Sequence, residues 1–206
     1  MKNVIAIDLP QPSTKIIEAI KKFVALQTIS IDSKNKLEEF HHHTINPVSF
    51  NFFVPDFLTL LVRKEYQHFF PHHQLKGMIG VFKNHTTSPA CMPTHIDRTR
   101  AIGLNYFIDS GGNDVRTFFY DREDISATGI STNVLYSEVT PIENFIAKPN
   151  TWYCYNVRRC HSVENIETTR TFIALKIIRP GLGLDSDYEY NIIDFQKDYP
   201  HLCIGS

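Results

Sequence analysis

The chain has 206 residues, a formal net charge of −1, 42% hydrophobic residues and 21% charged residues, which suits one soluble domain with one sizeable core. The near-neutral charge argues against non-specific nucleic-acid binding, and no apolar run reaches the roughly 20 residues of a membrane span. The four cysteines show no CxxC spacing, and the first residues include an aspartate and two prolines too early for a secretory signal. We therefore expect a cytoplasmic protein in a reducing compartment.

Two amphipathic helices are predicted in the first part of the chain. Residues 12–29 space apolar side chains three or four positions apart, with Ser13 as the N-cap. Residues 55–70 repeat this spacing behind Pro55, at a position that tolerates proline. The polar stretch 32–47 between them is typical of a loop.

Beyond these helices the pattern changes to short segments rich in β-branched and aromatic residues, separated by turn signals. These predicted strands are 77–82, 100–108, 115–120, 134–139, 144–149, 151–157 and 170–178. Helices followed by strands predict a mainly β domain, an antiparallel sandwich or barrel with N-terminal helices packed on one face. We expect a single domain over 1–206, with a helical part over 1–75, a β core over about 76–180 and a C-terminal extension over 181–206.

His95, Asp97 and His161 form a candidate metal site. Side chains two apart in a strand share a face, so His95 and Asp97 can grip one ion together, and His161 offers a second imidazole downstream. Two histidines and one carboxylate occupy one face of an octahedron, the ligand set of non-heme iron(II) oxygenases. The competing interpretation is a strand-end His95 bonded to a backbone carbonyl, with Asp97 capping a turn.

Arg170 begins a strongly apolar strand nine residues after the second histidine. Alternation places Arg170 on one face with Phe172 and Ala174, and an arginine on an interior face is costly unless it is paired. Its planar guanidinium group can donate two parallel hydrogen bonds to a carboxylate. The alternative is an arginine at the mouth of the strand that pairs with Glu164 or Glu167.

The order His95-Ile96-Asp97, then His161, then Arg170 resembles the signature of the 2-oxoglutarate/iron(II)-dependent dioxygenase superfamily. The segment HSVENIETTRTFIALKI is similar to its aspartyl/asparaginyl β-hydroxylase and prolyl-hydroxylase-like branches, and the resemblance covers about residues 76–180. It implies a double-stranded β-helix (jelly-roll, cupin-like) core and Fe(II) bound by His95, Asp97 and His161. It also implies 2-oxoglutarate as co-substrate, with Arg170 on its distal carboxylate, and dioxygen as the oxidant.

Other residues extend this candidate site. Counting alternately from His95 and Asp97 brings Asn105 to the interior face, where it either donates to the oxoacid or satisfies a neighbouring backbone group. Tyr155 or Asn156 approaches the site from the strand before the second histidine, depending on register.

Four arginines flank the candidate ligands in sequence: Arg98, Arg100, Arg158 and Arg159. They either hold a substrate carboxylate or phosphate, or form a solvated rim. We expect a hydroxylase acting on an amino acid, an amino-acid-derived small molecule or a peptide side chain, with a carboxylate-bearing substrate favoured. The alternatives are a cupin-like metalloenzyme that does not use 2-oxoglutarate and a non-catalytic jelly-roll binding module.

Overall fold

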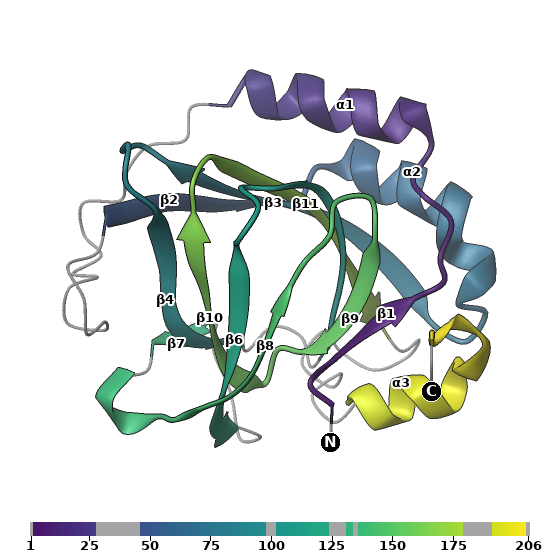
Figure 1. Cartoon of the computed structure of the whole chain (residues 1–206). Helices are drawn as coiled ribbons and strands as arrows, with labels where there is room; N and C mark the ends of the chain where they lie inside the picture. Colours follow the sequence, from purple (N-terminus) through teal and green to yellow (C-terminus); the bar gives the residue numbers. More distant parts are fainter. Residues whose placement is uncertain are drawn as a thin grey trace.

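The computed structural model describes residues 2–27, 46–97, 102–123, 131–133, 136–178 and 191–204 (Figure 1). Most of the predicted 32–47 loop therefore lies outside the described residues, and so do Arg98 and Arg100. None of the helices in these ranges is long and apolar enough to cross a membrane.

Two antiparallel sheets form the body of the molecule (Figure 1). The first sheet has the strand order β1 (Val4–Ile7), β9 (Trp152–Asn156), β5 (Ile102–Ser110), β11 (Thr169–Ile178), β3 (Gln74–Asn84), β2 (Asn46–Phe53). The second has the order β4 (Ala90–Asp97), β10 (Arg159–Ile166), β6 (Arg116–Glu123), β8 (Pro141–Ile146), with β7 (Ser131–Asn133) paired to β4. A short parallel pairing of the first residues of β2 and β4 connects the two sheets along one edge.

The helices α1 (Thr14–Ala25), α2 (Asp56–Tyr66) and α3 (Ile192–Asp198) pack against the outer face of the first sheet. Ile16 and Ile20 of α1 lie one turn apart and are both buried, as the helical spacing predicts. Short 3₁₀ turns complete the described structure: Gln67–Phe69, Tyr136–Glu138 and Pro200–Leu202. Tyr66 and Trp152 both donate to the Pro10 carbonyl and so fix the segment that leads into α1.

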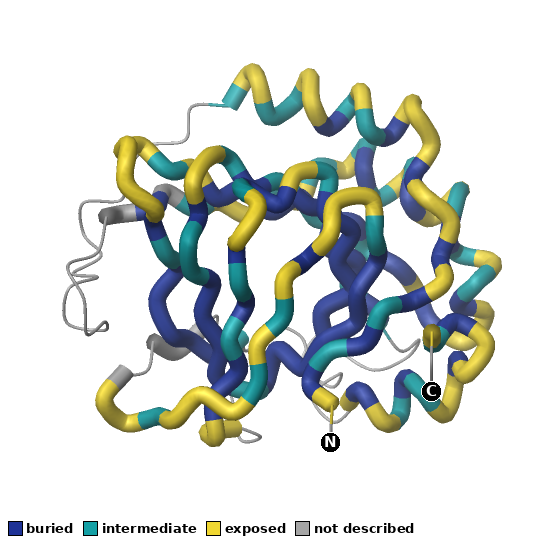
Figure 2. Tube along the Cα trace, in the orientation of Figure 1, coloured by how far each residue is buried: buried dark blue, intermediate teal, exposed yellow. Residues whose placement is uncertain are grey.

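Alternation along β11 divides the core in two, and Figure 2 shows buried chain on both sides of this sheet. Ile173 and Leu175 face the helices, whereas Phe172 and Ala174 join the cluster between the two sheets. Arg170 lies on the same face of β11 as Phe172 and Ala174, as predicted. The expected fold is confirmed: a mainly β double-stranded β-helix with N-terminal helices on one face.

Several element boundaries differ from the sequence prediction. Within 134–139 the described residues form the 3₁₀ turn Tyr136–Glu138, so a strand there is wrong. The strand expected over 144–149 lies earlier, at Pro141–Ile146. The N-terminal part is not purely helical, since it contributes β1 and β2 to the sheet.

Candidate metal centre

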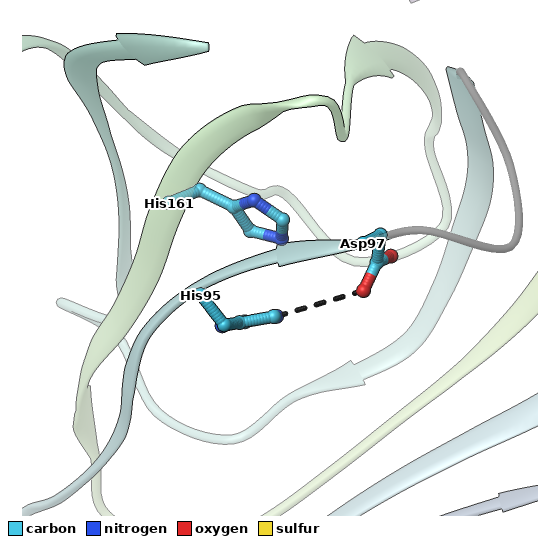
Figure 3. A group of neighbouring side chains, drawn as sticks. All are labelled: His95, Asp97 and His161. Carbon is cyan, nitrogen blue, oxygen red and sulfur yellow. Dashed lines mark ion pairs between the residues drawn. The ribbon is translucent and has the colours of Figure 1, made fainter. Parts of the chain in front are cut away.

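The three candidate ligands converge from two neighbouring strands (Figure 3). In the antiparallel pair β4–β10, His161 lies directly opposite His95, and Asp97 follows two residues later on β4. The His95 Nε2 atom lies 3.8 Å from a carboxylate oxygen of Asp97, and the candidate ligand atoms all lie within 4.8 Å of one another. In the part of the chain that the structure describes, this is the one cluster of at least three His, Cys, Asp or Glu side chains with such geometry.

Both imidazoles are oriented by main-chain carbonyls. The Nδ1 atom of His95 lies 2.8 Å from the Pro93 carbonyl oxygen, and that of His161 lies 2.9 Å from the Arg159 carbonyl oxygen. A carbonyl oxygen can only accept, so each Nδ1 carries the proton and each Nε2 keeps its lone pair. A carbonyl bond at the second ring nitrogen is the usual support for a metal-binding histidine. The backbone-bonded histidine considered as an alternative is therefore present and leaves Nε2 available for a metal.

The donor set suits Fe(II). Two neutral imidazoles and one carboxylate on one side of the ion leave the remaining positions open for other oxygen ligands. His95 and His161 are buried and Asp97 is half-buried, so the ligands lie inside the β-helix and are reached from one side.

Arg170 is almost completely buried, with 2% of its surface exposed. Its Nη2 atom lies 3.5 Å from the Thr117 hydroxyl, and its guanidinium carbon lies 4.5 Å from the centre of the Phe107 ring. Within the described residues, its Nε and Nη1 atoms are buried without a hydrogen-bond partner, and Arg170 pairs with neither Glu164 nor Glu167. Burial lowers the pKa of Arg170 to about 10, with an opposing contribution from Tyr155, so the guanidinium stays protonated at neutral pH.

The triad and Arg170 share one pocket although they come from different sheets. The rest of its lining comes from Phe52, Phe82, Thr117, Tyr155, Val163 and Phe172. The pocket thus combines a metal-binding face, a buried cation and an aromatic wall.

The other predicted site residues have different places. Asn105 is fully buried and its amide donates to the hydroxyl of Tyr155, so it supports a residue that lines the pocket. Asn156 instead donates to Glu123 at 2.8 Å. Thr117 was not predicted, because nothing in the isolated β6 sequence marks its hydroxyl as a neighbour of an arginine more than fifty residues away.

The two described flanking arginines, Arg158 and Arg159, differ in their burial and in their partners. Arg159 forms an ion pair with Glu123 at 2.7 Å and its side chain is only 18% exposed, so it is paired and partly buried, not a freely solvated rim residue. Arg158 is buried, with 4% of its surface exposed, and its backbone N–H donates to the Asn156 side chain.

Comparison with known proteins gives structural matches only. No family model matches the sequence, and no curated protein matches it. The epimerase SnoN, solved with Fe3+, alpha ketoglutarate and nogalamycin RO, matches with a TM-score of 0.50 and 9% identity over 86% of this chain and 79% of that chain. A prolyl hydroxylase from Trichoplax adhaerens, in complex with a hypoxia inducible factor peptide fragment, matches with a TM-score of 0.46 and 13% identity over 89% of this chain and 86% of that one. A Pseudomonas putida prolyl-4-hydroxylase matches with a TM-score of 0.42 and 13% identity over 85% of this chain and 91% of that one.

The match to SnoN concerns the fold, and the triad is an observation on this chain. The chain has the double-stranded β-helix fold of the 2-oxoglutarate/iron(II) dioxygenases and carries an HxD…H triad inside it. The expected likeness to this superfamily is confirmed at the level of the fold.

Proposed function

We propose that this protein is a 2-oxoglutarate- and iron(II)-dependent oxygenase that hydroxylates an amino acid, an amino-acid-derived small molecule or a peptide side chain. One observation carries the proposal: a buried guanidinium, with no carboxylate partner among the residues that the structure describes, lines the same pocket as the triad. A buried cation of this kind costs free energy, and a ligand carboxylate offsets that cost with charge-assisted hydrogen bonds.

Three side chains would bind the iron, and two backbone carbonyls orient the histidines among them. His95 and His161 would hold the iron through Nε2, and Asp97 would hold it through its carboxylate, while the carbonyls of Pro93 and Arg159 keep both rings in place. Iron bound here supplies oxidation of a substrate C–H bond by dioxygen, coupled to decarboxylation of 2-oxoglutarate to succinate. Asp97 completes the triad, which favours hydroxylation over halogenation.

Arg170 binds and orients the co-substrate. Its Nε and Nη1 atoms are available for the distal carboxylate of 2-oxoglutarate, and the Thr117 hydroxyl beside Nη2 is a further donor. Phe107 lies against the guanidinium and Phe172 lies against Phe107, with ring centres 5.5 Å apart, so water is excluded from this end of the pocket. Low local polarity strengthens the bonds between the arginine and the carboxylate.

The test is an iron titration in an oxygen electrode, combined with a succinate assay across a library of metabolites and short peptides. We expect one iron per chain and substrate-stimulated succinate release. Arg170→Ala should keep iron binding and lose 2-oxoglutarate affinity, whereas Arg116→Ala, which removes a partly exposed arginine, should keep both.

The two alternatives predict other results. A cupin-like metalloenzyme would bind iron and retain its activity in Arg170→Ala. A non-catalytic jelly-roll module would take up no metal and release no succinate.

A further inference from the structure

A row of phenyl rings crosses the inner face of the first sheet. The Phe107 and Phe172 ring centres lie 5.5 Å apart, and those of Phe172 and Phe52 lie 6.0 Å apart. Gly80 of β3 lies between Phe172 and Phe52. It is directly opposite Phe172 in the pairing with β11 and directly opposite Phe52 in the pairing with β2. A Cβ atom at Gly80 would lie 2.1 Å from the Phe172 ring, so only glycine lets this ring extend over β3 and reach Phe52.

The last ring of the row differs from the others in its exposure. Phe107 and Phe172 are 0% and 3% exposed, whereas Phe52 is 37% exposed although it lines the metal pocket. β2 pairs with β3 from Val48 to Phe53, whereas its pairing with β4 is confined to Asn46 and Pro47, so within the described residues no strand pairs with Phe52 on that side. Phe52 therefore offers apolar surface at the pocket, and such surface gains free energy when a ligand covers it.

The two ends of the row suit different ligand groups. Phe107 at one end contacts the guanidinium of Arg170, which the co-substrate carboxylate requires. Phe52 lies at the other end, on β2. 2-Oxoglutarate has a carboxylate at each end and only two methylene groups between its functional groups, so it offers no bulky apolar group to Phe52.

We propose that Phe52 is a specificity-determining residue that contacts an aliphatic or aromatic group of the primary substrate. This inference rests on the proposed function, since it assigns the remaining aromatic surface of the pocket to the molecule that is oxidised there. It narrows the substrate class to compounds that carry a bulky apolar group.

The experiment uses the full chain loaded with Zn(II), which occupies the triad without oxidising the probes, in the presence of 2-oxoglutarate. The probes are N-acetyl-L-phenylalaninamide, N-acetyl-L-leucinamide and N-acetyl-L-alaninamide, with binding followed by NMR saturation transfer and titration. We expect the first two to bind about tenfold more tightly than the alanine probe, because each buries a larger apolar group. Saturation should pass from the protein to their phenyl or methyl protons.

Phe52→Ala should remove this preference and leave the 2-oxoglutarate affinity within about twofold of the wild type. Phe52→Leu, which keeps an apolar side chain, should retain most of it. Phe50→Ala is the matched control, because Phe50 has the same parity on β2, contacts Phe82 with ring centres 6.4 Å apart and does not line the pocket. It should keep the preference.

Three outcomes overturn the inference: equal binding of all three probes, a preference that survives in Phe52→Ala, or a fall in 2-oxoglutarate affinity in Phe52→Ala that matches the fall in probe affinity. The last would place Phe52 in the co-substrate site. Failure of the wild-type Zn(II) protein to bind 2-oxoglutarate would instead overturn the proposed function, and this is measured first in the same samples.

Discussion

At the scale of single residues, the orientation of the two histidines carries the metal assignment. Each Nδ1 donates to a carbonyl two residues earlier in the chain, at 2.8 Å and 2.9 Å, so both rings are fixed before any metal arrives. A fixed ring loses little freedom on binding, and the two rings act together with the carboxylate of Asp97.

Replacement of one ligand should therefore weaken metal binding strongly. We expect His161→Ala to lower Co(II) affinity by more than about 100-fold, since the loss of a direct ligand exceeds the 10- to 100-fold effect of an outer partner. Titration of the cobalt absorption bands measures this change. His85→Ala removes an exposed histidine outside the cluster and should leave the titration unchanged. Equal loss in both variants would contradict the triad.

Arg170 should serve ligand binding at the expense of stability. Burial lowers its pKa to about 10, below the value in the unfolded chain, so the unfolded chain binds this proton more tightly. The resulting destabilisation is fully present below pH 10 and disappears as the pH rises above the unfolded pKa. Arg170→Met fills the same space without a charge. It should raise the free energy of unfolding by about 1–3 kcal/mol in the absence of ligands and lower 2-oxoglutarate affinity by at least about 100-fold.

Urea denaturation at neutral pH and calorimetric titration of the Zn(II) protein measure these two effects. Arg116→Met provides the control, because this half-exposed arginine is paired with Asp114 at 2.8 Å and its loss should change stability little. A less stable Arg170→Met variant would mean that the guanidinium supports the empty fold, and the argument from an uncompensated charge would fail.

At the scale of elements, the strand β3 depends on Gly80. The ring of Phe172 occupies the place where a Cβ atom would lie, at 2.1 Å. We expect Gly80→Ala to displace this ring and lower the free energy of unfolding by about 1–3 kcal/mol, the usual cost of overpacking. The double variant Gly80→Ala/Phe172→Leu removes the obstructing ring, so its loss of stability should be smaller than the sum of the two single losses. Additive losses in urea denaturation would contradict this packing.

Sequence alone identified the elements in which apolar residues recur at a regular spacing. Helices α1 and α2 and the strands β5, β9 and β11 show regular apolar spacing, and the parity of Arg170 on β11 followed from alternation. The two strands that carry the triad were not found as elements. In β4 a proline and the ligands themselves replace apolar residues, and in β10 five polar or charged residues interrupt the pattern. Functional side chains on interior positions erase the periodicity by which a strand is recognised.

At the scale of the whole molecule, the site depends on contacts between the sheets that chain order does not reveal. The clustering of His95, Asp97 and His161 and the interior position of Arg170 could be predicted because these residues occur in a recognisable order along the chain. Thr117 and Phe52 could not, since β6 and β2 meet the pocket from opposite sheets and neither strand is adjacent in sequence to a ligand. Asn105 was placed on the correct face, but only the structure shows that it reaches the pocket through Tyr155.

This arrangement predicts how ligands stabilise the whole fold. The triad lies on β4 and β10 of one sheet, whereas Arg170 lies on β11 of the other. Under the proposed function, a metal alone would tie two neighbouring strands, and the metal with 2-oxoglutarate would tie both sheets. A ligand that binds only the native state adds about 2.7 kcal/mol at a concentration 100 times its Kd. We expect Zn(II) to raise the Tm, and 2-oxoglutarate to raise it further only when the metal is present.

Differential scanning calorimetry of three variants separates the two contributions. Asp97→Ala should lose the increase in Tm from Zn(II) and also the one from 2-oxoglutarate, because 2-oxoglutarate needs the metal for its chelating end. Arg170→Met should keep the increment from Zn(II) and lose the one from 2-oxoglutarate, and Phe50→Ala should keep both. If 2-oxoglutarate raised the Tm of Asp97→Ala by as much as that of the wild type, it would bind without the metal, and the link between the two sheets would not pass through the triad.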